Sequence, residues 1–282
     1  MLGALLVRNQ ADVYFGELNT EAKSLENIEQ ITADERDDYP SSWTPDGASL
    51  LFASDRLGSR GIFKWSRSSE SLELVSERGY NAVFTADGSS ILSQVDGGIV
   101  TLPASGGASQ ILTDRADHVQ CTPSFEPECV IGFVDGDKYV FSSLNPSTGT
   151  TKELTRISYR APFTNWSLAP DRDLVAVVHG DDNIVRLIEL STREETPLEV
   201  ENWSKFEFVE WAADGQSLFL NAGISFAGAY AVLLQVNMEG QAHVLRDVPN
   251  VWHVAPTPSP DGRYLAFAAM PFHGNMWLIQ DF

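Results

Sequence analysis

The residues best suited to chemistry are scattered along the chain and form no known motif. The sequence has no Gly-x-Ser-x-Gly nucleophile elbow, no His-Glu-x-x-His metal motif, no phosphate-binding Gly-rich loop with Lys and no dinucleotide fingerprint. Five histidines lie in different segments: His118, His179, His243, His253 and His273. We therefore expect no catalytic residues and no enzyme activity, with metal-assisted hydrolysis by residues from separate segments as the alternative.

Two small groups of residues carry redox or ligand chemistry. Cys121 and Cys129 stand eight residues apart, at the two ends of one predicted hairpin. They can form a disulfide in an oxidising compartment, or pack as two small buried side chains. Asp181, Asp182 and Asn183 offer oxygens suited to Ca²⁺, although a tight polar turn explains them more simply. We expect no cofactor and no metal, with Ca²⁺ as the one exception.

A tight turn recurs along the chain and must position all of these residues. In Tyr39–Phe63 an apolar strand runs into Pro-Asp-Gly and then into a second apolar strand. Gly supplies a positive φ and Asp tolerates the left-handed region, so this pattern predicts a β-hairpin. The hairpin occurs six times: WTPDG (43–47), FTADG (84–88), FEPEC (125–129), LAPDR (168–172), WAADG (211–215) and PSPDG (258–262). The turn-forming residues are Asp46, Gly47, Asp87, Gly88, Asp171, Asp214, Gly215, Asp261 and Gly262.

The spacing of these turns predicts the architecture. Their acidic residues, with Glu128 in the third turn, follow one another at intervals of 41, 41, 43, 43 and 47 residues. A repeat of about 40 to 45 residues with four short alternating strands is typical of a β-propeller blade. The repeat runs nearly from end to end, so we predict an all-β protein with one propeller domain over residues 1–282.

The number of blades depends on how the ring closes. The pattern predicts 26 strands, whereas seven blades of four strands need 28. We therefore expect seven blades with two strands missing at the closure, which makes the chain the carboxy-terminal part of a longer protein. The alternative is six blades closed by 27–32, with residues 1–18 left as an extra sheet edge.

Composition narrows the choice of partner. The chain has 19 basic and 39 acidic residues, a net charge of −20, which repels a phosphate backbone and argues against nucleic-acid binding. No apolar run is long enough to span a bilayer, so we expect no direct membrane insertion. The apolar segment 1–7 is too short for a signal-peptide core and reads as a strand.

These hairpins resemble a known family of propellers. The Pro-Asp-Gly turns followed by FASDRLGSRGIF resemble the WD-repeat-like propeller repeats of TolB and its relatives. DVYFGEL, DDYPSSWTPDG, WAADGQSLFL and PSPDGRYLAFAAMPFHGNMWLIQDF are similar to the carboxy-terminal propeller of bacterial membrane-anchored serine/threonine kinases and winged-helix regulators. The resemblance spans nearly the whole chain. It implies a sensor or protein-interaction module located in the periplasm or outside the cell.

One face of such a propeller carries residues suited to recognition. The loops between blades are rich in aromatic and Arg side chains, which commonly anchor protein interfaces. These candidates are Arg36, Asp38, Tyr39, Tyr80, His118, Tyr159, Arg160, Trp203, Trp252 and His253. For Tyr39, Tyr80 and Trp252 the alternative is that they wedge neighbouring blades together. We therefore predict a non-catalytic module for a protein or peptide partner. The alternatives are a hydrolase or lyase with a site in the channel, and the propeller domain of a peptidase.

Overall fold

Every regular element in the described part of the protein is a β-strand. The computed structural model describes residues 2–19, 23–122, 129–160, 164–180, 183–224 and 230–279, and these residues form 25 strands and no helix. The all-β prediction is confirmed. None of the described residues belongs to a helix long and apolar enough to cross a membrane.

Sixteen strands form four separate antiparallel sheets, here called blades 1 to 4. Blade 1 contains β4 (Asp38–Trp43), β5 (Ser49–Ser54), β6 (Gly61–Ser66) and β7 (Ser71–Ser76). Blade 2 contains β8 (Tyr80–Phe84), β9 (Ser90–Val95), β10 (Gly98–Pro103) and β11 (Gln110–Thr113). Blade 3 contains β12 (His118–Cys121), β13 (Cys129–Asp135), β14 (Lys138–Leu144) and β15 (Thr151–Ser158). Blade 4 contains β16 (Thr164–Leu168), β17 (Leu174–His179), β18 (Ile184–Glu189) and β19 (Glu195–Glu199).

The remaining nine strands form one larger sheet that contains two more units of four. Blade 5 contains β20 (Phe206–Trp211), β21 (Ser217–Ile224), β22 (Tyr230–Asn237) and β23 (Ala242–Arg246). Blade 6 contains β24 (Val251–Pro258), β25 (Tyr264–Ile279), β2 (Asp12–Asn19) and β3 (Ser24–Gln30). A single parallel pair, Ala231 with Trp252, joins the two blades. The ninth strand is β1 (Leu2–Asn9).

The six blades close into a ring. Their innermost strands β4, β8, β12, β16, β20 and β24 contact one another in that order, and β24 contacts β4. The seven-bladed prediction is therefore wrong. The six-bladed alternative has the right number, but both β2 and β3 complete blade 6, because β2 pairs with β25 along 12–17. The extra edge is confined to β1, whereas the prediction extended it to residue 18.

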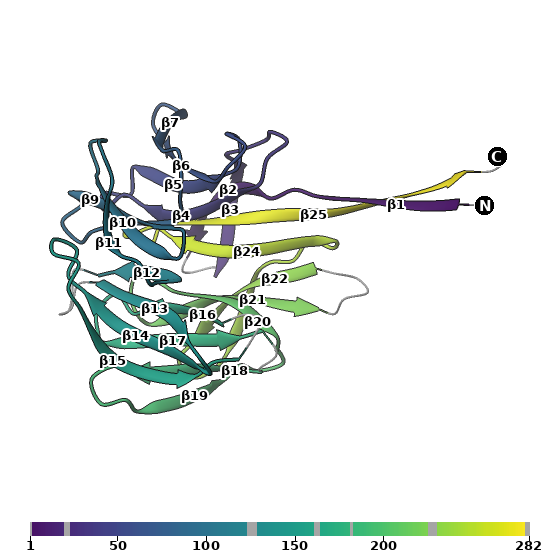
Figure 1. Ribbon diagram of the computed structural model, residues 1–282. Helices are drawn as coiled ribbons and strands as arrows, with labels where there is room; N and C mark the ends of the chain where they lie inside the picture. Colours follow the sequence, from purple (N-terminus) through teal and green to yellow (C-terminus); the bar gives the residue numbers. More distant parts are fainter. Residues whose placement is uncertain are drawn as a thin grey trace.

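The two ends of the chain lie side by side. β1 pairs antiparallel with the far half of β25, from Leu2 opposite Ile279 to Asn9 opposite Phe272. Figure 1 shows this pair extending away from the ring as a two-stranded arm with both termini at its tip. The near half of β25 stays within blade 6, between β24 and β2. One long strand thus belongs to both the ring and the arm.

The hydrophobic core lies between neighbouring blades. Strand residues alternate between the two faces of a sheet, so each blade presents an apolar face to the blade on either side. Phe141 of blade 3 meets Trp166 of blade 4 with ring centroids 5.2 Å apart. Phe15 of blade 6 meets Trp43 and Trp65 of blade 1 at 6.3 and 5.2 Å. These contacts stabilise the ring blade by blade.

Polar side chains join the inner strands around the axis. The Ser167 hydroxyl in blade 4 accepts a bond from Trp211 N–H in blade 5 at 3.0 Å, and the Trp211 indole donates to Ser167 O at 3.1 Å. The Trp43 indole of blade 1 donates in the same way to Thr257 O of blade 6 at 2.9 Å. The Ser42 hydroxyl donates to Ala82 O of blade 2 at 2.9 Å. Side chains thus satisfy backbone groups at the open edges of the inner strands.

The four described Asp-Gly turns share one geometry. Asp46 accepts bonds from the Thr44 hydroxyl at 2.6 Å and Ala48 N–H at 3.0 Å, and Gly47 has φ +67°. The same acceptor role belongs to Asp87, Asp214 and Asp261, and positive φ to Gly88, Gly215 and Gly262. Asp171 stands in a turn without Gly, where it contacts Arg172 at 3.5 Å. Each turn thus reverses the chain between the first two strands of its blade.

Replacing Ser167 with Ala tests the joints between blades. The variant leaves the buried Trp211 N–H without its acceptor, so we expect the free energy of unfolding to fall by about 1–3 kcal/mol. Urea unfolding followed by tryptophan fluorescence measures the change. Ser147→Ala, at an exposed serine whose backbone N–H makes its bond to Asn145, is the matched control and should change stability by less than about 0.5 kcal/mol. Equal stability of both variants would contradict the proposed role of Ser167.

Candidate functional site: the central channel

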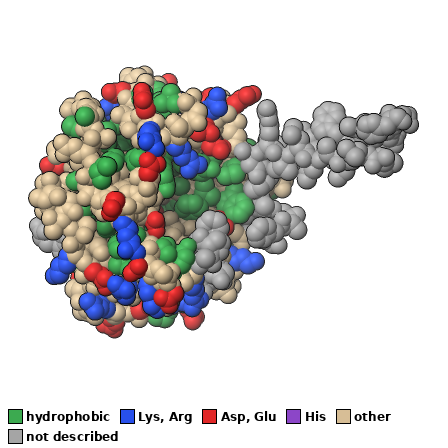
Figure 2. Space-filling view, viewed as in Figure 1, with side chains coloured by type: hydrophobic (Ala, Val, Ile, Leu, Met, Phe, Trp, Pro, Cys, Tyr) green, Lys and Arg blue, Asp and Glu red, His purple; other side chains and the backbone are tan. Residues whose placement is uncertain are grey.

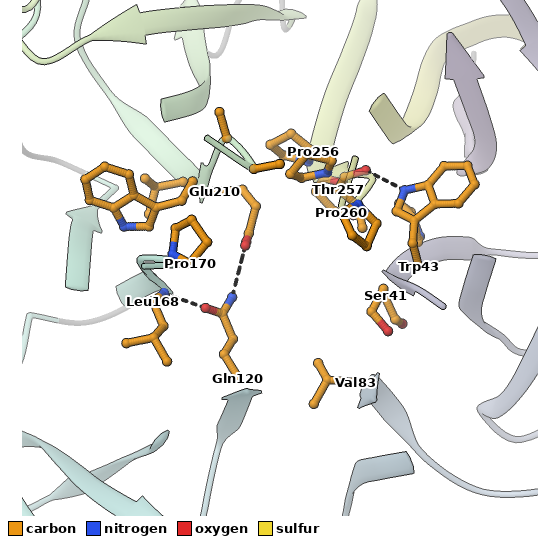
Figure 3. Close-up of a pocket in the computed structure, with 18 of the residues that line it drawn as sticks. Ser41, Trp43, Val83, Gln120, Leu168, Pro170, Glu210, Pro256, Thr257 and Pro260 are labelled. Carbon is orange, nitrogen blue, oxygen red and sulfur yellow. Dashed lines mark hydrogen bonds between the residues drawn. The ribbon is translucent and has the colours of Figure 1, made fainter. Parts of the chain in front are cut away.

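A cavity of about 320 Å³ lies on the axis of the ring, and all six inner strands line it. Figure 3 shows side chains from different blades converging on it, among them Trp43, Val83, Gln120 and Glu210. Figure 2 shows hydrophobic side chains gathered in the recessed middle of one face, with charged side chains around them. A cavity of this size has room for roughly ten waters or a short piece of an extended ligand.

Strand register shows that the channel is built from equivalent positions in each blade. In each blade, one residue near the end of the inner strand pairs with the start of the second strand. These residues are Trp43, Phe84, Cys121, Leu168, Trp211 and Pro258. One residue earlier in each blade stands a second equivalent set, here called the channel ring: Ser42, Val83, Gln120, Ser167, Glu210 and Thr257. All of them except the buried Ser167 line the cavity. Glu210 is the one member of this ring with an ionisable side chain.

The third blade departs from its predicted register. The sequence pattern placed Phe125 and Glu128 at the positions of Trp43 and Asp46, but residues 123–128 lie outside the described part of the chain. Strand pairing puts Cys121, directly opposite Cys129, in the place of Trp43. The two cysteines are joined by a disulfide with Cα atoms 4.0 Å apart. The bond therefore links the first two strands of blade 3 beside the channel, which Cys121 lines.

Glu210 lies in the channel among neutral donors. Its carboxylate accepts a bond from the Ser167 hydroxyl at 2.9 Å, and Gln120 Nε2 lies 3.4 and 3.2 Å from its two oxygens. Gln120 is itself held by Leu168 N–H, which donates to its Oε1 at 2.5 Å (Figure 3). Burial raises the pKa of Glu210 to about 8, because the ionised form has lost most of its water and no counter-charge replaces it. Glu210 is thus largely a neutral acid at pH 7.

The rest of the channel wall is apolar or neutral. Among the described lining residues only Glu210 and His118 can carry a charge. The His118 ring contacts Trp166 edge-on, with centroids 4.9 Å apart, and its buried Nε2 has no hydrogen-bond partner in the described structure. Burial lowers the pKa of His118 to about 4, so this ring is neutral at pH 7. Glu210 is therefore the only lining group that can ionise near neutral pH.

The channel wall also holds strained backbone. Ala255 of β24 and Asn81 of β8 have φ values of +51° and +49°, and each lies at a bulge in the pairing of its strand. A positive φ costs a residue with a side chain about 1 kcal/mol or more, and such strain is concentrated at functional sites. Both residues line the cavity. A bulge bends its strand and re-aims the side chains beside it, here at the cavity.

Two predicted recognition residues are fully buried, so they cannot anchor a partner as the sequence analysis proposed. His253 donates through Nδ1 to Ala231 O at 2.9 Å and accepts from Arg246 through Nε2 at 3.1 Å, with no exposed surface. Asp38 is equally buried and pairs with Arg56 at 3.1 Å. Both residues hold strands together: His253 links β24 to β22, and Asp38 lies where β4 meets the chain before β2.

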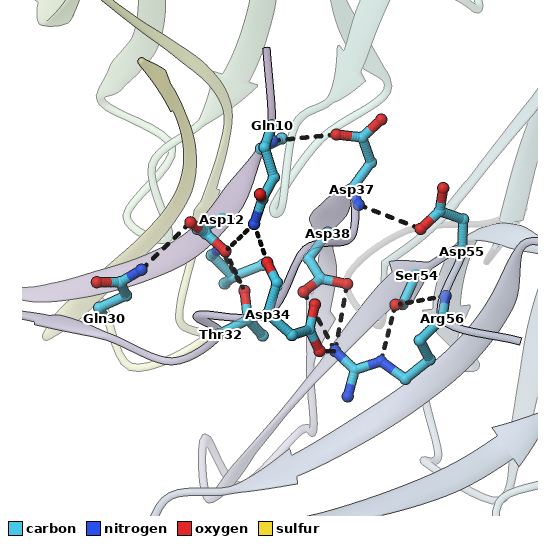
Figure 4. A network of polar contacts seen from close by, with 12 residues as sticks. Gln10, Asp12, Gln30, Thr32, Asp34, Asp37, Asp38, Ser54, Asp55 and Arg56 are labelled. Atoms are coloured by element: carbon cyan, nitrogen blue, oxygen red, sulfur yellow. Dashed lines mark hydrogen bonds and ion pairs between the residues drawn. The ribbon is translucent and has the colours of Figure 1, made fainter. Parts of the chain in front are cut away.

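A polar network explains the position of Asp38. Figure 4 shows Arg56 between Asp34 and Asp38, while Asp37 accepts from Ala11 N–H at 3.1 Å and donates through its own N–H to Asp55 at 3.2 Å. These bonds tie the segment before β2 to blade 1, and so help to close the ring. No group of three or more His, Cys, Asp or Glu side chains within the described ranges is arranged to hold a metal ion. The predicted Ca²⁺ site falls on Asp181 and Asp182, which lie outside the described residues.

The other predicted recognition residues are spread over several places. Arg36 and Arg160 are exposed, and Tyr159 stacks on Tyr139 with centroids 6.3 Å apart. Half-buried Tyr80 and Trp203 pack against the cores beside them. His118 lies in the channel wall, away from the loops.

Two of the predicted aromatic residues do come together. Tyr39 and Trp252 share one apolar cluster with Phe208, in which residues of blades 1, 5 and 6 meet. This shared cluster favours the wedge alternative for Tyr39 and Trp252. Phe208 also lines the cavity, so the cluster adjoins the channel.

Sequence reasoning missed the channel ring, although the repeats contained a signal for it. Aligning the hairpins WTPDG, FTADG, LAPDR, WAADG and PSPDG places Ser42, Val83, Ser167, Glu210 and Thr257 at one position. The single charged residue in this set was visible there. Gln120 could not be aligned in this way, because the third hairpin has a different length between its paired strands.

Comparison with solved structures agrees with this fold. No protein-family model matches the sequence, and no curated protein matches it. A TolB-like protein from Agrobacterium tumefaciens superposes with a TM-score of 0.67 at 14% identity, over 93% of this chain and 99% of that one. A chain of a nidogen/laminin complex gives 0.64 at 8% identity, over 84% and 94%. An oligogalacturonate lyase from Vibrio parahaemolyticus gives 0.54 at 11%, over 95% and 98%. The chain thus has a TolB-like β-propeller fold, which these proteins share despite their different roles.

The pH dependence of stability tests the environment of Glu210. Protonation of Glu210 stabilises the fold, so stability falls as pH rises from about 4.5 to about 8. His118 and His253, whose pKa values burial lowers to about 4, act in the opposite direction between about pH 4 and 6.5. Between pH 6.5 and 8 we expect a loss of up to about 1.4 kcal/mol per pH unit. Urea unfolding at half-unit steps should show this slope in the wild type and not in Glu210→Gln; parallel curves would refute the assignment.

Removing the disulfide tests its contribution to blade 3. The bond closes a short loop between residues eight positions apart, which corresponds to about 2–3 kcal/mol of stabilisation. We expect the free energy of unfolding of the Cys121→Ala/Cys129→Ala variant, measured by urea unfolding, to be lower by that amount. Reducing agent should shift the wild type in the same direction and leave the variant unchanged. A variant as stable as the oxidised wild type would contradict this expectation.

Proposed function

We propose that this protein is a non-catalytic recognition module that binds an extended segment of a protein or peptide partner in its central channel. The observation that carries the proposal is the open cavity itself, walled by all six inner strands. Side-chain hydrogen bonds bridge the inner strands of neighbouring blades. The cavity that these strands surround contains no described side chain.

The walls of the channel suit a peptide. Trp43, Trp211, Phe208 and several prolines provide flat apolar surface, and Gln120 and Glu210 provide hydrogen-bonding groups. Binding sites commonly combine a mainly apolar wall with a few placed polar groups. The ring is held by many bonds between blades, so the site is preformed and little ordering is needed on binding.

The cellular setting belongs to the same proposal. The resemblance of the hairpins to propellers of membrane-anchored bacterial kinases and winged-helix regulators supports a sensor role in signalling. The Cys121–Cys129 disulfide supports an oxidising location, in the periplasm or outside the cell. The net charge of −20 supports a protein or peptide partner in preference to nucleic acid.

Peptide selection against a blocked channel tests this proposal. Val83 points into the channel, so Val83→Trp fills it (Figure 3). Val244→Trp, at an exposed position of β23, is the matched control. Peptides selected from a displayed random library on the wild type should bind Val83→Trp at least tenfold more weakly and Val244→Trp equally well, as measured by fluorescence anisotropy.

Two outcomes would overturn the proposal. One is that no peptide is enriched on the wild type above a blank surface. The other is that the selected peptides bind Val83→Trp as tightly as the wild type. Loss of binding in Tyr39→Ala/Trp252→Ala with full binding to Val83→Trp would move the site to the loop face.

A channel enzyme is the second candidate. Glu210, with its pKa near neutrality, has the acid–base range of a catalytic carboxyl, and an oligogalacturonate lyase shares the fold. Turnover of oligogalacturonate that disappears in Glu210→Gln would favour a lyase over a recognition module. The peptidase alternative needs a catalytic domain encoded elsewhere.

A further inference from the structure

We infer that Glu210 is the recognition group of the channel and that it binds a primary ammonium group carried by the ligand. This inference rests on the proposed function, because it names the chemistry of the ligand that enters the channel. It depends on the position of Glu210 in the channel wall, on its neutral partners and on the lack of any other group among the described lining residues that ionises near neutral pH.

The hydrogen bonds around Glu210 leave room for a further donor. A carboxylate can accept about four hydrogen bonds. Ser167 donates to Oε1 at 2.9 Å, and one Gln120 amide nitrogen lies 3.4 Å from Oε1 and 3.2 Å from Oε2. The carboxyl lines the cavity, and Figure 3 shows it facing the open space between the blades. An incoming N–H group can therefore reach Oε2 without displacing either neighbour.

The charges around this carboxyl favour a cation. Among the cavity-lining residues of β20, only Glu210 is ionisable. Among those of β12, only His118 is, and it is neutral at pH 7. The described lining residues of β4, β8, β16 and β24 include no Lys, Arg, Asp or Glu. Arg172 stacks over the ring of Trp211, with Cζ 5.4 Å from the centroid, but does not line the cavity. A cationic ligand therefore meets one carboxyl and no positive charge among the described lining residues. A ligand carboxylate would gain no counter-charge there.

An ammonium group fits better than a metal ion. Ca²⁺ takes six to eight oxygen ligands and usually several carboxylates. The channel supplies one carboxyl, and within the described residues no cluster of metal-ligating side chains exists. An ammonium group has three donors, which can reach Glu210 and neighbouring neutral oxygens. Its aliphatic chain would lie against the indoles and prolines of the wall.

Binding of an ammonium group must release a proton. Glu210 is mostly protonated at pH 7, and pairing with a cation requires the ionised form. The proton that leaves the carboxyl passes to the buffer, while the ligand keeps its charge. With a pKa of about 8, roughly 0.9 proton is released per ligand at pH 7 and roughly 0.1 at pH 9.

Calorimetry with hexylamine and hexanol tests this inference. Titrations at pH 7 in two buffers of different ionisation enthalpy, repeated at pH 9, count the protons released. We expect hexylamine to bind with the release stated above and hexanol to bind at least tenfold more weakly. Equal binding of the amine and the alcohol at both pH values would overturn the inference.

Two variants assign the effect to Glu210. Glu210→Gln keeps a side chain that can bond to Ser167 and Gln120, and should bind hexylamine at least tenfold more weakly with no proton release. Glu207→Gln changes a half-buried carboxyl on the same strand that does not line the cavity, and should bind as the wild type does. Circular dichroism confirms that both variants fold. A folded Glu210→Gln variant with unchanged affinity would overturn the inference.

Short peptides separate the two sources of the ammonium group. Acetyl-Gly-Lys-Gly-amide offers a lysine side chain, Gly-Gly-Gly-amide offers a free amino terminus, and acetyl-Gly-norleucine-Gly-amide offers neither. Tighter binding of either amine than of the norleucine peptide supports the inference and identifies the source. Equal binding of all three overturns it. If peptides selected on the wild type lose affinity for Val83→Trp but not for Glu210→Gln, the recognition function stands and the ammonium assignment fails.

Discussion

The structure depends on how the innermost strands satisfy their free edges. Each inner strand pairs on one side only, except β24, which also makes one parallel pair with β22. The other edge of an inner strand turns backbone N–H and C=O groups toward the axis and the preceding blade. Ser42, Gln120 and Ser167 supply the missing partners across the blade boundaries. These polar side chains bond backbone groups that a neighbouring strand would otherwise satisfy. The ring is therefore held on the outside by apolar packing between sheets and on the inside by side-chain bonds to backbone.

The same constraint governs the closure. β24 and the near half of β25 cannot form a blade alone, and β2 and β3 from the other end of the chain complete the sheet. The polar network around Arg56 and Asp37 then ties the segment before β2 to blade 1. A closing blade built from both termini joins the two ends of the chain in one sheet. This arrangement removes the open edge that a linear array of blades would leave exposed.

The sequence predicted the repeat well and the closure poorly, for physical reasons. Asp46-Gly47 and its equivalents are fixed by local turn chemistry, which a single sequence records directly. The number of blades depends on which distant strands pair. The sequence of residues 12–19 has the same strand pattern whether these residues form an extra sheet edge or a strand of the closing blade. Asp38 and His253 looked like loop anchors because their type is polar, but their burial is a tertiary property. Glu210 was visible as the odd member of an aligned position, yet its meaning required the ring.

Glu210 departs from the pattern by which the other polar residues of the channel ring join neighbouring blades. At the equivalent positions, Ser42 and Ser167 reach across to the next blade, and Thr257 offers its carbonyl to Trp43. Glu210 instead accepts bonds from the side chains of blades 3 and 4 and holds a carboxyl in a place where its ionisation is costly. Gln at this position would make the same two contacts without that cost. Glu210 lowers stability at neutral pH and lies in an open cavity whose wall contains strained backbone. A role in binding a ligand explains such a residue better than a role in joining the blades.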